Sequence, residues 1–382
     1  LDIQFPDEEV AFREEIQQFL RDELPDDWDP LNQGSPHSPE QLPFTKAMAD
    51  KLADKGWLTL AWPEEYGGQA RSIMEQTVYR EEMTYWGVPG TDLGTGAIGW
   101  VGPVLMISGT EEQKSEHLPP IANAERYWCT LYSEPGSGSD LASLQTSAVR
   151  DGDDYIINGS KIWTSYANHA DYCFLLVRSD PESSRHHGLS VILLPMDSEG
   201  IEIREIPSVV GKRYFHELFF TDVRVPRSCL LGVEGEGWKA VSYSLQYERV
   251  GAPRYARATV TLDRLAGLAR QKGLLDDPTV AEKLGRARAA CEAARVLSYR
   301  VIDQRAHGLP PSADTNVARI AGTRVDKLVG DLALELTGSS GLEAGTFANA
   351  NFKLAMTAGV AVGATEVQLN LVASRLLGLP RE

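Results

Sequence analysis

The chain has 382 residues, of which 42% are hydrophobic and 24% are charged, a composition typical of globular rather than disordered proteins. At roughly 100–200 residues a domain, this length allows about two to four domains. The net charge of −17 argues against binding to nucleic acid or to an anionic membrane, because basic surfaces drive both. No run of about 18 apolar residues occurs, so we expect no integral membrane segment.

The four cysteines lie far apart and form no CxxC pair, so we expect reduced thiols and neither a disulfide framework nor a zinc site. His186 and His187 are adjacent in a polar stretch, where a solvated loop is expected rather than a metal site. The acidic start LDIQFPDEEV differs from the basic and then apolar start of an export signal. We therefore expect a cytoplasmic protein.

Residues 1–126 are predicted to be mostly helical. Apolar residues from Phe12 to Leu24 repeat at helical spacing until Pro25, and helical patterns return over residues 44–55 and 73–85. The glycines of GTGAIG, residues 94–99, match the dinucleotide pattern GxGxxG. They lie in this helical block and not between a strand and a helix of a βαβ unit, so we interpret them as sites of close helix packing.

Residues 127–231 are predicted to form a β domain. Short segments rich in β-branched and aromatic residues follow one another there, separated by Gly, Asp, Ser and Pro. No helical period interrupts them, so we expect antiparallel pairing in a barrel or sandwich. Residues 232–382 turn helical again, with alanine-rich stretches that predict a bundle. The expected fold is therefore a multidomain α+β protein with three consecutive domains.

Two segments of the β domain have the chemistry of a nucleotide-cofactor site. In CTLYSEPGSGSDLASLQTSA, residues 129–148, Gly136 and Gly138 allow close approach to a ligand, and nearby serines offer hydroxyl groups. In the second segment, the flat ring of Trp163 is followed by the hydroxyl residues Thr164 and Ser165. The residues alone leave open that the first segment is an ordinary turn and that Trp163 belongs to the core.

Glu248 occupies an unusual position for a carboxylate. It follows Trp238, Val241 and Leu245 at steps of three, four and three residues, which places it on the apolar stripe of a helix. A charge there must be paired, hydrogen-bonded or shifted in pKa, and such carboxylates often serve as general bases. A structural ion pair with Arg249 remains the alternative.

Several long motifs occur in one order along nearly the whole chain. Together they resemble the flavin-dependent acyl-CoA dehydrogenase family, which has a helical N-terminal domain, a central β domain and a C-terminal four-helix bundle. The motifs are GWLTLAWPEEYGG, GTEEQK, LPPI, YSEPGSGSDLASLQTSA, GSKIWTS, FFTDVRVPRSCLLG with GEGW, and VGATEVQLNLVASRLLGLPR.

The resemblance implies FAD-dependent oxidation of an acyl-CoA thioester to the 2-enoyl-CoA, with electrons passing to an electron-transfer flavoprotein. It also implies a homotetramer or an α2β2 hetero-tetramer. Ser139, Gln246 and Arg249 would contact the acyl-CoA substrate. The implied FAD contacts are Thr130, Tyr132, Ser133, Gly138, Ser139, Trp163, Thr164, Ser165, Glu335, Gly338, Ser339, Thr365 and Glu366.

The resemblance also selects the catalytic base. Many members carry a glutamate just before the glycine of the C-terminal segment, where this chain has Val362, whereas others use the glutamate of an ER pair, here Glu248–Arg249.

The chain departs from the family in lacking its RxxFG element, near whose place ARQKGLLDDP stands. Alternatives left open are an oxidase or monooxygenase of the same fold and a partner subunit of a hetero-tetrameric dehydrogenase.

Overall fold

The computed structural model describes residues 6–31, 36, 38–90, 97–183, 185–248, 253–310, 312–360 and 363–380, with only the backbone described over 211–214 and 244–248. The chain forms two compact units. Unit 1 consists of Leu1–Gly34, Arg71–Val88 and Arg249–Glu382, and unit 2 of Ser35–Ala70 and Pro89–Glu248. Because this division is discontinuous in sequence, it does not test the three consecutive domains, whose boundaries stay predictions.

Two helices of unit 1 come from the N-terminal part of the chain. Helix α1 (Asp7–Glu23) buries Phe12, Ile16, Phe19 and Leu20, as its apolar spacing predicted, and it ends before Pro25. Helix α3 (Ile73–Tyr85) begins at a capping box. The Ser72 hydroxyl accepts a hydrogen bond from the backbone N–H of Glu75, and the Glu75 carboxylate accepts one from the backbone N–H of Ser72. Both helices match the predicted segments.

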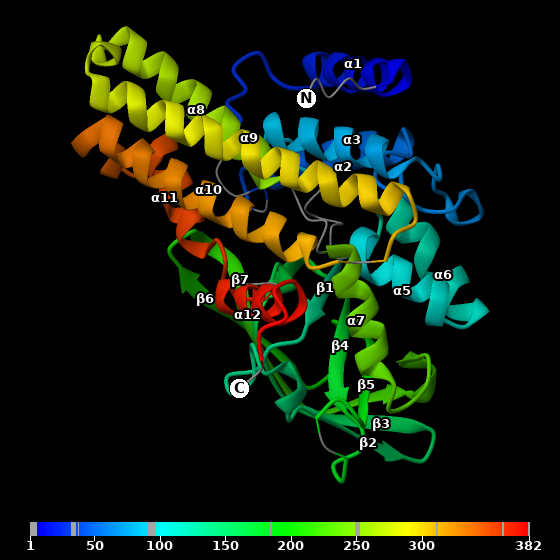
Figure 1. The fold of residues 1–382 in the computed structure, drawn as a ribbon. Helices are drawn as coiled ribbons and strands as arrows, with labels where there is room; N and C mark the ends of the chain where they lie inside the picture. The colour runs from blue at the N-terminus through cyan, green and yellow to red at the C-terminus, as the bar shows by residue number, and fades with distance from the viewer. Residues whose placement is uncertain are drawn as a thin grey trace. The chain divides into compact units, whose positions relative to one another are not determined.

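The remaining helices of unit 1 form the predicted C-terminal bundle (Figure 1). Helix α10 packs against four others, and fully buried alanines such as Ala287, Ala294 and Ala333 allow the helices to approach closely. The helices are α8 (Arg254–Gln271), α9 (Pro278–Ala306), α10 (Asp314–Thr337), α11 (Phe347–Thr357) and α12 (Thr365–Arg375).

Unit 2 contains an eight-stranded sheet, in which seven strands follow the order β6-β7-β3-β2-β4-β5-β8 and the eighth, β1, pairs with β4. The expected antiparallel pairing holds for most neighbours, but β1 and β2 both run parallel to β4, so the sheet is mixed. The strands are β1 (Trp128–Leu131), β2 (Ser147–Asp151), β3 (Asp154–Ser165), β4 (Tyr172–Arg178), β5 (Leu189–Pro195), β6 (Ile201–Ser208), β7 (Gly211–Pro226) and β8 (Leu230–Leu231).

Strand β4 is buried on both faces. Cys173, Leu175 and Val177 face one apolar core, and the alternate residues Phe174 and Leu176 belong to a second core. The second core also includes residues of four helical segments of unit 2. These segments are the π-helix η2 (Ala97–Val101), α5 (Gly102–Ser108), α6 (Glu111–Ala122) and α7 (Gly237–Glu248).

The four cysteines are free thiols, although Cys129 and Cys173 are register partners on β1 and β4. His186 and His187 are exposed in a turn, as expected. Of the GxGxxG glycines, Gly99 lies in η2, where an added Cβ would meet no atom within 4 Å, so the prediction of close helix packing is wrong at this position. Residues 94 and 96 lie outside the described residues. Within the described ranges, no helix combines the length and apolar composition needed to cross a membrane.

Candidate active site

The glycine-rich segment forms a tight turn after β1. Glu134 and Ser137 exchange backbone hydrogen bonds of 2.8 and 3.0 Å around Pro135 and Gly136. A Cβ atom added to Gly136 or Gly138 would meet no atom within 4 Å, so the packing of the chain itself leaves this backbone surface open. The hydroxyl of Ser137 is buried and donates to the carbonyl oxygens of Asp140 and Leu141. Ser137 therefore stabilises the turn rather than offering a donor to a ligand.

The other predicted contacts of this segment lie around the turn. Thr130 and Tyr132 are half-buried, and the Tyr132 ring meets Phe174 edge-on at 6.1 Å between centroids. Ser133 is half-buried, and its carbonyl oxygen accepts a 2.9 Å bond from the backbone N–H of Ile162. Ser139, like Gly138, is exposed. The bond from Ile162 to Ser133 joins the turn directly to β3.

The end of β3 presents the second predicted segment. The register between β3 and β7 shifts between Lys161 and Thr164, and Trp163 within this bulge has a φ of 63°. Such a positive φ is an outlier for a bulky residue. The Trp163 side chain is 56% exposed, and its ring meets Phe215 edge-on. The bulge thus holds an aromatic ring at the surface, and Trp163 is not a core residue.

Thr164 differs from its neighbours because its side chain is buried with an unsatisfied hydroxyl group. Its hydroxyl oxygen has no hydrogen-bond partner among the described residues, which is costly for a buried polar atom. Ser165 next to it is half-buried. An exposed ring and an unsatisfied hydroxyl on consecutive residues suit a planar ligand with hydrogen-bonding edges, so these residues fit the isoalloxazine ring of a flavin.

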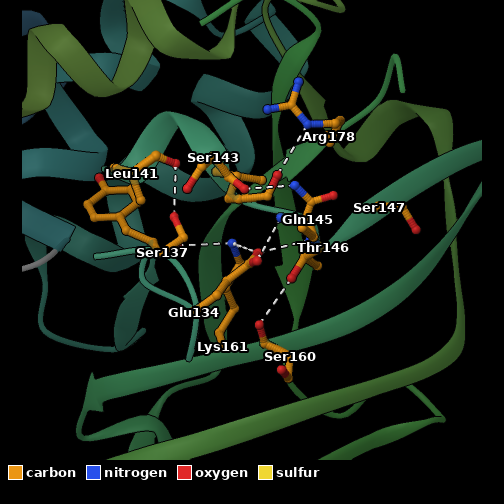
Figure 2. Close-up of polar contacts among 12 residues, drawn as sticks. Glu134, Ser137, Leu141, Ser143, Gln145, Thr146, Ser147, Ser160, Lys161 and Arg178 are labelled. Carbon is orange, nitrogen blue, oxygen red and sulfur yellow. Dashed lines mark hydrogen bonds and ion pairs between the residues drawn. The ribbon is translucent and has the colours of Figure 1, made fainter. Parts of the chain in front are cut away.

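A buried ion pair joins the two segments. The Glu134 carboxylate lies 2.8 Å from Nζ of Lys161, and their side chains are 8% and 0% exposed. Figure 2 shows Glu134 between Lys161 and the backbone of the 145–146 stretch. Burial raises the pKa of Glu134, but Lys161 and neighbouring donors outweigh it and lower the pKa overall. Burial lowers the pKa of Lys161 to about 8, although Glu134 opposes this effect.

Sequence analysis missed this pair, although one signal was available. Tyr155, Ile157 and Lys161 occupy alternate positions of β3, and the first two face the core. A lysine at an inward position of a strand needs a buried partner. The identity of that partner, 27 positions away at Glu134, could not be read from the spacing.

The predicted contacts of the helical part lie in unit 1. Glu335 near the end of α10 is exposed and forms an ion pair with Lys283 of α9. Gly338 follows α10 with a φ of 63°, and Ser339 is exposed beside it. Thr365 and Glu366 form the first turn of α12, which packs against α10. Their roles in cofactor binding stay predictions.

The predicted base and substrate contacts are only partly described. Helix α7 extends to Glu248, with the Val241 side chain fully buried and that of Trp238 half-buried in the same core. The first part of the apolar stripe therefore faces inward. The side chains of Gln246 and Glu248, and the whole of Arg249, lie outside the described residues.

Comparison with known proteins gives matches along most of the chain. Residues 6–125 match the family model "Acyl-CoA dehydrogenase, N-terminal domain", residues 129–223 match its middle domain, and residues 235–377 match its C-terminal domain. The sequence is 34% identical to the acyl-CoA dehydrogenase IpdE1 of Mycobacterium tuberculosis, over 97% of this chain and 98% of that protein. It is 36% identical to FadE26 of the same organism, over 87% of each chain.

Solved structures share the fold over the whole length. A structure titled "Tcur3481-Tcur3483 steroid ACAD" superposes with a TM-score of 0.91 at 34% identity, covering 100% of both chains. The ChsE4-ChsE5 complex from Mycobacterium tuberculosis gives a TM-score of 0.88 at 31% identity, again over 100% of both chains.

Proposed function

Because the chain belongs to the acyl-CoA dehydrogenase family, we propose that it oxidises an acyl-CoA thioester to the 2-enoyl-CoA with noncovalently bound FAD. The observation that carries this proposal is the bulge of β3, where the exposed ring of Trp163 precedes the unsatisfied hydroxyl of Thr164. Bound FAD supplies the acceptor for the hydride that leaves the β carbon of the acyl group.

The base in this proposal is Glu248. Its carboxylate accepts the proton from the α carbon of the thioester while the C–H bond at the β carbon breaks, so that the C=C bond forms between the two carbons. A positioned general base is typically worth ~10²–10⁴-fold in rate. Gln246, two positions before Glu248, and Arg249, directly after it, are proposed to hold the substrate.

The chain's own residues have distinct proposed tasks toward FAD. The Trp163 ring packs against the flavin, and the hydroxyls of Thr164 and Ser165 bind its polar edge. Ser133 and Ser139 line the ring and the thioester, together with Thr130, Tyr132 and Gly138. The residues of unit 1 that we propose as FAD contacts are Glu335, Gly338, Ser339, Thr365 and Glu366.

We propose a bulky, steroid-type acyl group as the substrate and an electron-transfer flavoprotein as the electron acceptor. The substrate class is supported by the likeness to a structure whose title names a steroid acyl-CoA dehydrogenase. Electron transfer to a flavoprotein is typical of the family and is proposed on that ground alone. Rapid reoxidation of the reduced flavin by air would instead favour the oxidase alternative.

We further propose that the chain works with a second, related chain in an α2β2 hetero-tetramer. Two observations favour this assembly over a homotetramer. The RxxFG element, whose arginine reaches the FAD of a neighbouring subunit in the family, is missing from this sequence. One of the similar structures is, by its title, a complex of two different chains.

Anaerobic titration of the purified protein with acyl-CoA thioesters tests the proposed reaction. Straight-chain, branched and steroid-type acyl groups should be compared, with loss of the oxidised flavin absorbance as the readout. We expect bleaching with the steroid-type thioester. A yellow protein that no thioester bleaches, alone or with a related second chain, would overturn the proposal.

A further inference from the structure

We propose that the ion pair of Glu134 and Lys161 is a positioning device that holds the two flavin-binding segments in one geometry, without either charge contacting the substrate. The inference rests on the FAD-binding function proposed above. Both side chains are almost wholly buried, and each belongs to a different segment. We call the pair and its backbone partners, described next, the clamp.

Glu134 uses both carboxylate oxygens on the clamp. Oε1 accepts from Nζ of Lys161 at 2.8 Å and from the backbone N–H of Thr146 at 2.9 Å. Oε2 accepts a 2.6 Å bond from the backbone N–H of Gln145. Charge-assisted bonds to backbone donors are short and strong. One carboxylate thereby fixes the end of the glycine-rich segment, residues 145–146, to its beginning.

Lys161 extends the clamp to β3. Its Nζ also donates a 3.0 Å bond to the carbonyl oxygen of Tyr132, two residues before Glu134. Between these two contacts, the N–H of Ile162 bonds the carbonyl oxygen of Ser133. Lys161 precedes the strained residue Trp163 by only two positions. The pair therefore holds the backbone on both sides of Ser133 and the stretch that leads into Trp163.

A second anchor restrains the same stretch from the opposite side, as Figure 2 shows. The guanidinium of Arg178 donates to the carbonyl oxygens of Ala142 at 2.8 Å and Leu144 at 3.1 Å. Its backbone N–H donates to the carbonyl oxygen of Thr146 at 2.8 Å. Residues 142–146 thus lie between two buried charged side chains, so little backbone freedom remains there once Glu134 is paired.

Placing two charges in the interior is costly, and an apolar pair of the same volume could pack as well. A buried pair is therefore weak evidence for stability, and the backbone that it orients gives the better account of its role. What it orients here is the backbone of both segments that are predicted to contact the flavin. Loss of one partner should loosen this geometry even in the absence of cofactor.

The test uses Glu134→Gln, Lys161→Met and the double variant in the full chain, together with its partner chain if FAD binding requires one. The double variant is needed because each single change leaves one buried charge unpaired, which can prevent folding. The double change removes both charges, so we expect this variant to fold. Arg224→Met is the matched control. Arg224 of β7 forms exposed ion pairs with Asp151 and Asp154 of the neighbouring hairpin, away from the clamp.

The first readout is hydrogen–deuterium exchange of the apoprotein, which requires no cofactor. The clamp predicts that the amides of Gln145, Thr146 and Ile162 exchange at least about tenfold faster in each clamp variant. Arg224→Met should leave these amides unchanged. Unchanged exchange in folded clamp variants would overturn the proposal.

The second readout is the dissociation constant and absorption spectrum of added FAD. We expect the affinity for FAD to fall at least about tenfold in the clamp variants, and the absorption band of the bound flavin to change shape. The double variant should bind FAD no more weakly than whichever single variant has the lower affinity. Clamp variants with faster amide exchange but unchanged FAD affinity and spectrum would refute the positioning role. If the wild-type protein binds no FAD, the proposed function fails, which is a different result from unchanged variants.

Discussion

His216 and Thr164 face each other across the β3–β7 pairing, with Nδ1 of the histidine 3.4 Å from the carbonyl oxygen of the threonine. His216 is 2% exposed, and burial lowers the pKa of its imidazole, although the Thr164 carbonyl and the carboxylate of Glu205 on β6 oppose this effect. The backbone of Thr164 is thus engaged by β7, while its hydroxyl is left for another partner.

The lowered pKa of His216 predicts a loss of stability in acid. The unfolded chain takes up the proton near the ordinary value of 6.5, and the folded chain only at lower pH, so protonation favours unfolding as the pH falls below that value. His216→Gln should reduce the dependence of the unfolding free energy on pH between about 6.5 and 5. Urea unfolding at several pH values measures this.

His117 provides the control for this experiment, because burial lowers the pKa of its imidazole as well. His117→Gln should remove only its own share of the acid sensitivity and leave the share of His216. A pH dependence that is identical in the wild type and in His216→Gln would contradict the assignment.

Replacing Thr164 by valine separates a ligand contact from a structural one. Because its hydroxyl has no partner among the described residues, Thr164→Val should leave apoprotein stability unchanged or raise it by about 1 kcal/mol. FAD affinity should fall by about tenfold if that hydroxyl binds the cofactor. Urea unfolding and FAD titration measure the two effects.

Thr146→Val is the matched control, since the Thr146 hydroxyl donates a 3.1 Å bond to the carbonyl oxygen of Ser160. It should cost about 1 kcal/mol of apoprotein stability. A Thr164→Val variant that is destabilised as much as Thr146→Val, with unchanged FAD affinity, would show that the Thr164 hydroxyl serves the fold.

Trp163 should be important for the cofactor and nearly dispensable for the fold. Trp163→Gly removes an exposed ring and increases the backbone freedom of the unfolded chain, which lowers stability. Glycine also relieves the strain of the positive φ, which raises stability, so we expect the free energy of unfolding to change by no more than about 1 kcal/mol. FAD binding should weaken strongly in Trp163→Gly and be largely retained in Trp163→Phe, which keeps a flat ring. Equal FAD affinity in both variants would exclude stacking on residue 163.

Arg178 should be required for stability. Besides Ala142 and Leu144, its guanidinium donates to the carbonyl oxygens of Ser183, Arg185 and His187. Arg178→Met would leave these acceptors without their donor and should cost about 3 kcal/mol or more in urea unfolding. Arg178→Lys retains the charge but not the fork of donors, so it should restore only part of that loss. Full restoration by lysine would mean that charge alone suffices.

Local patterns predicted the elements of this fold well, because burial imposes their period. Phe12, Ile16, Phe19 and Leu20 lie on the inward face of α1, and the alternating apolar residues of β4 occupy two cores. The direction of β1 was not predictable in the same way. Alternation tells which side chains face inward, but the partner of β1 is β4, whose register partners lie 44 positions further along the chain.

The candidate site was predictable only as a set of motifs. The family resemblance identified the two segments that form the turn and the bulge, and the family assignment is confirmed by the domain matches. The positive φ of Trp163 and the pairing of Glu134 with Lys161 have no local sign in the sequence, because each arises from contacts between distant segments. The use of the Ser137 hydroxyl inside its own turn was missed for a different reason, since serine occurs in turns and in ligand sites alike.

Glu248→Gln is the most direct test of the proposed reaction. Glu236→Gln, at an exposed position just before α7, is the matched control. Anaerobic mixing of each FAD-loaded protein with a thioester that bleaches the wild type should leave Glu248→Gln yellow and bleach Glu236→Gln at the normal rate. The expected loss for Glu248→Gln is at least ~10²-fold in the rate of bleaching, with FAD still bound. Bleaching of Glu248→Gln at the wild-type rate would contradict the account.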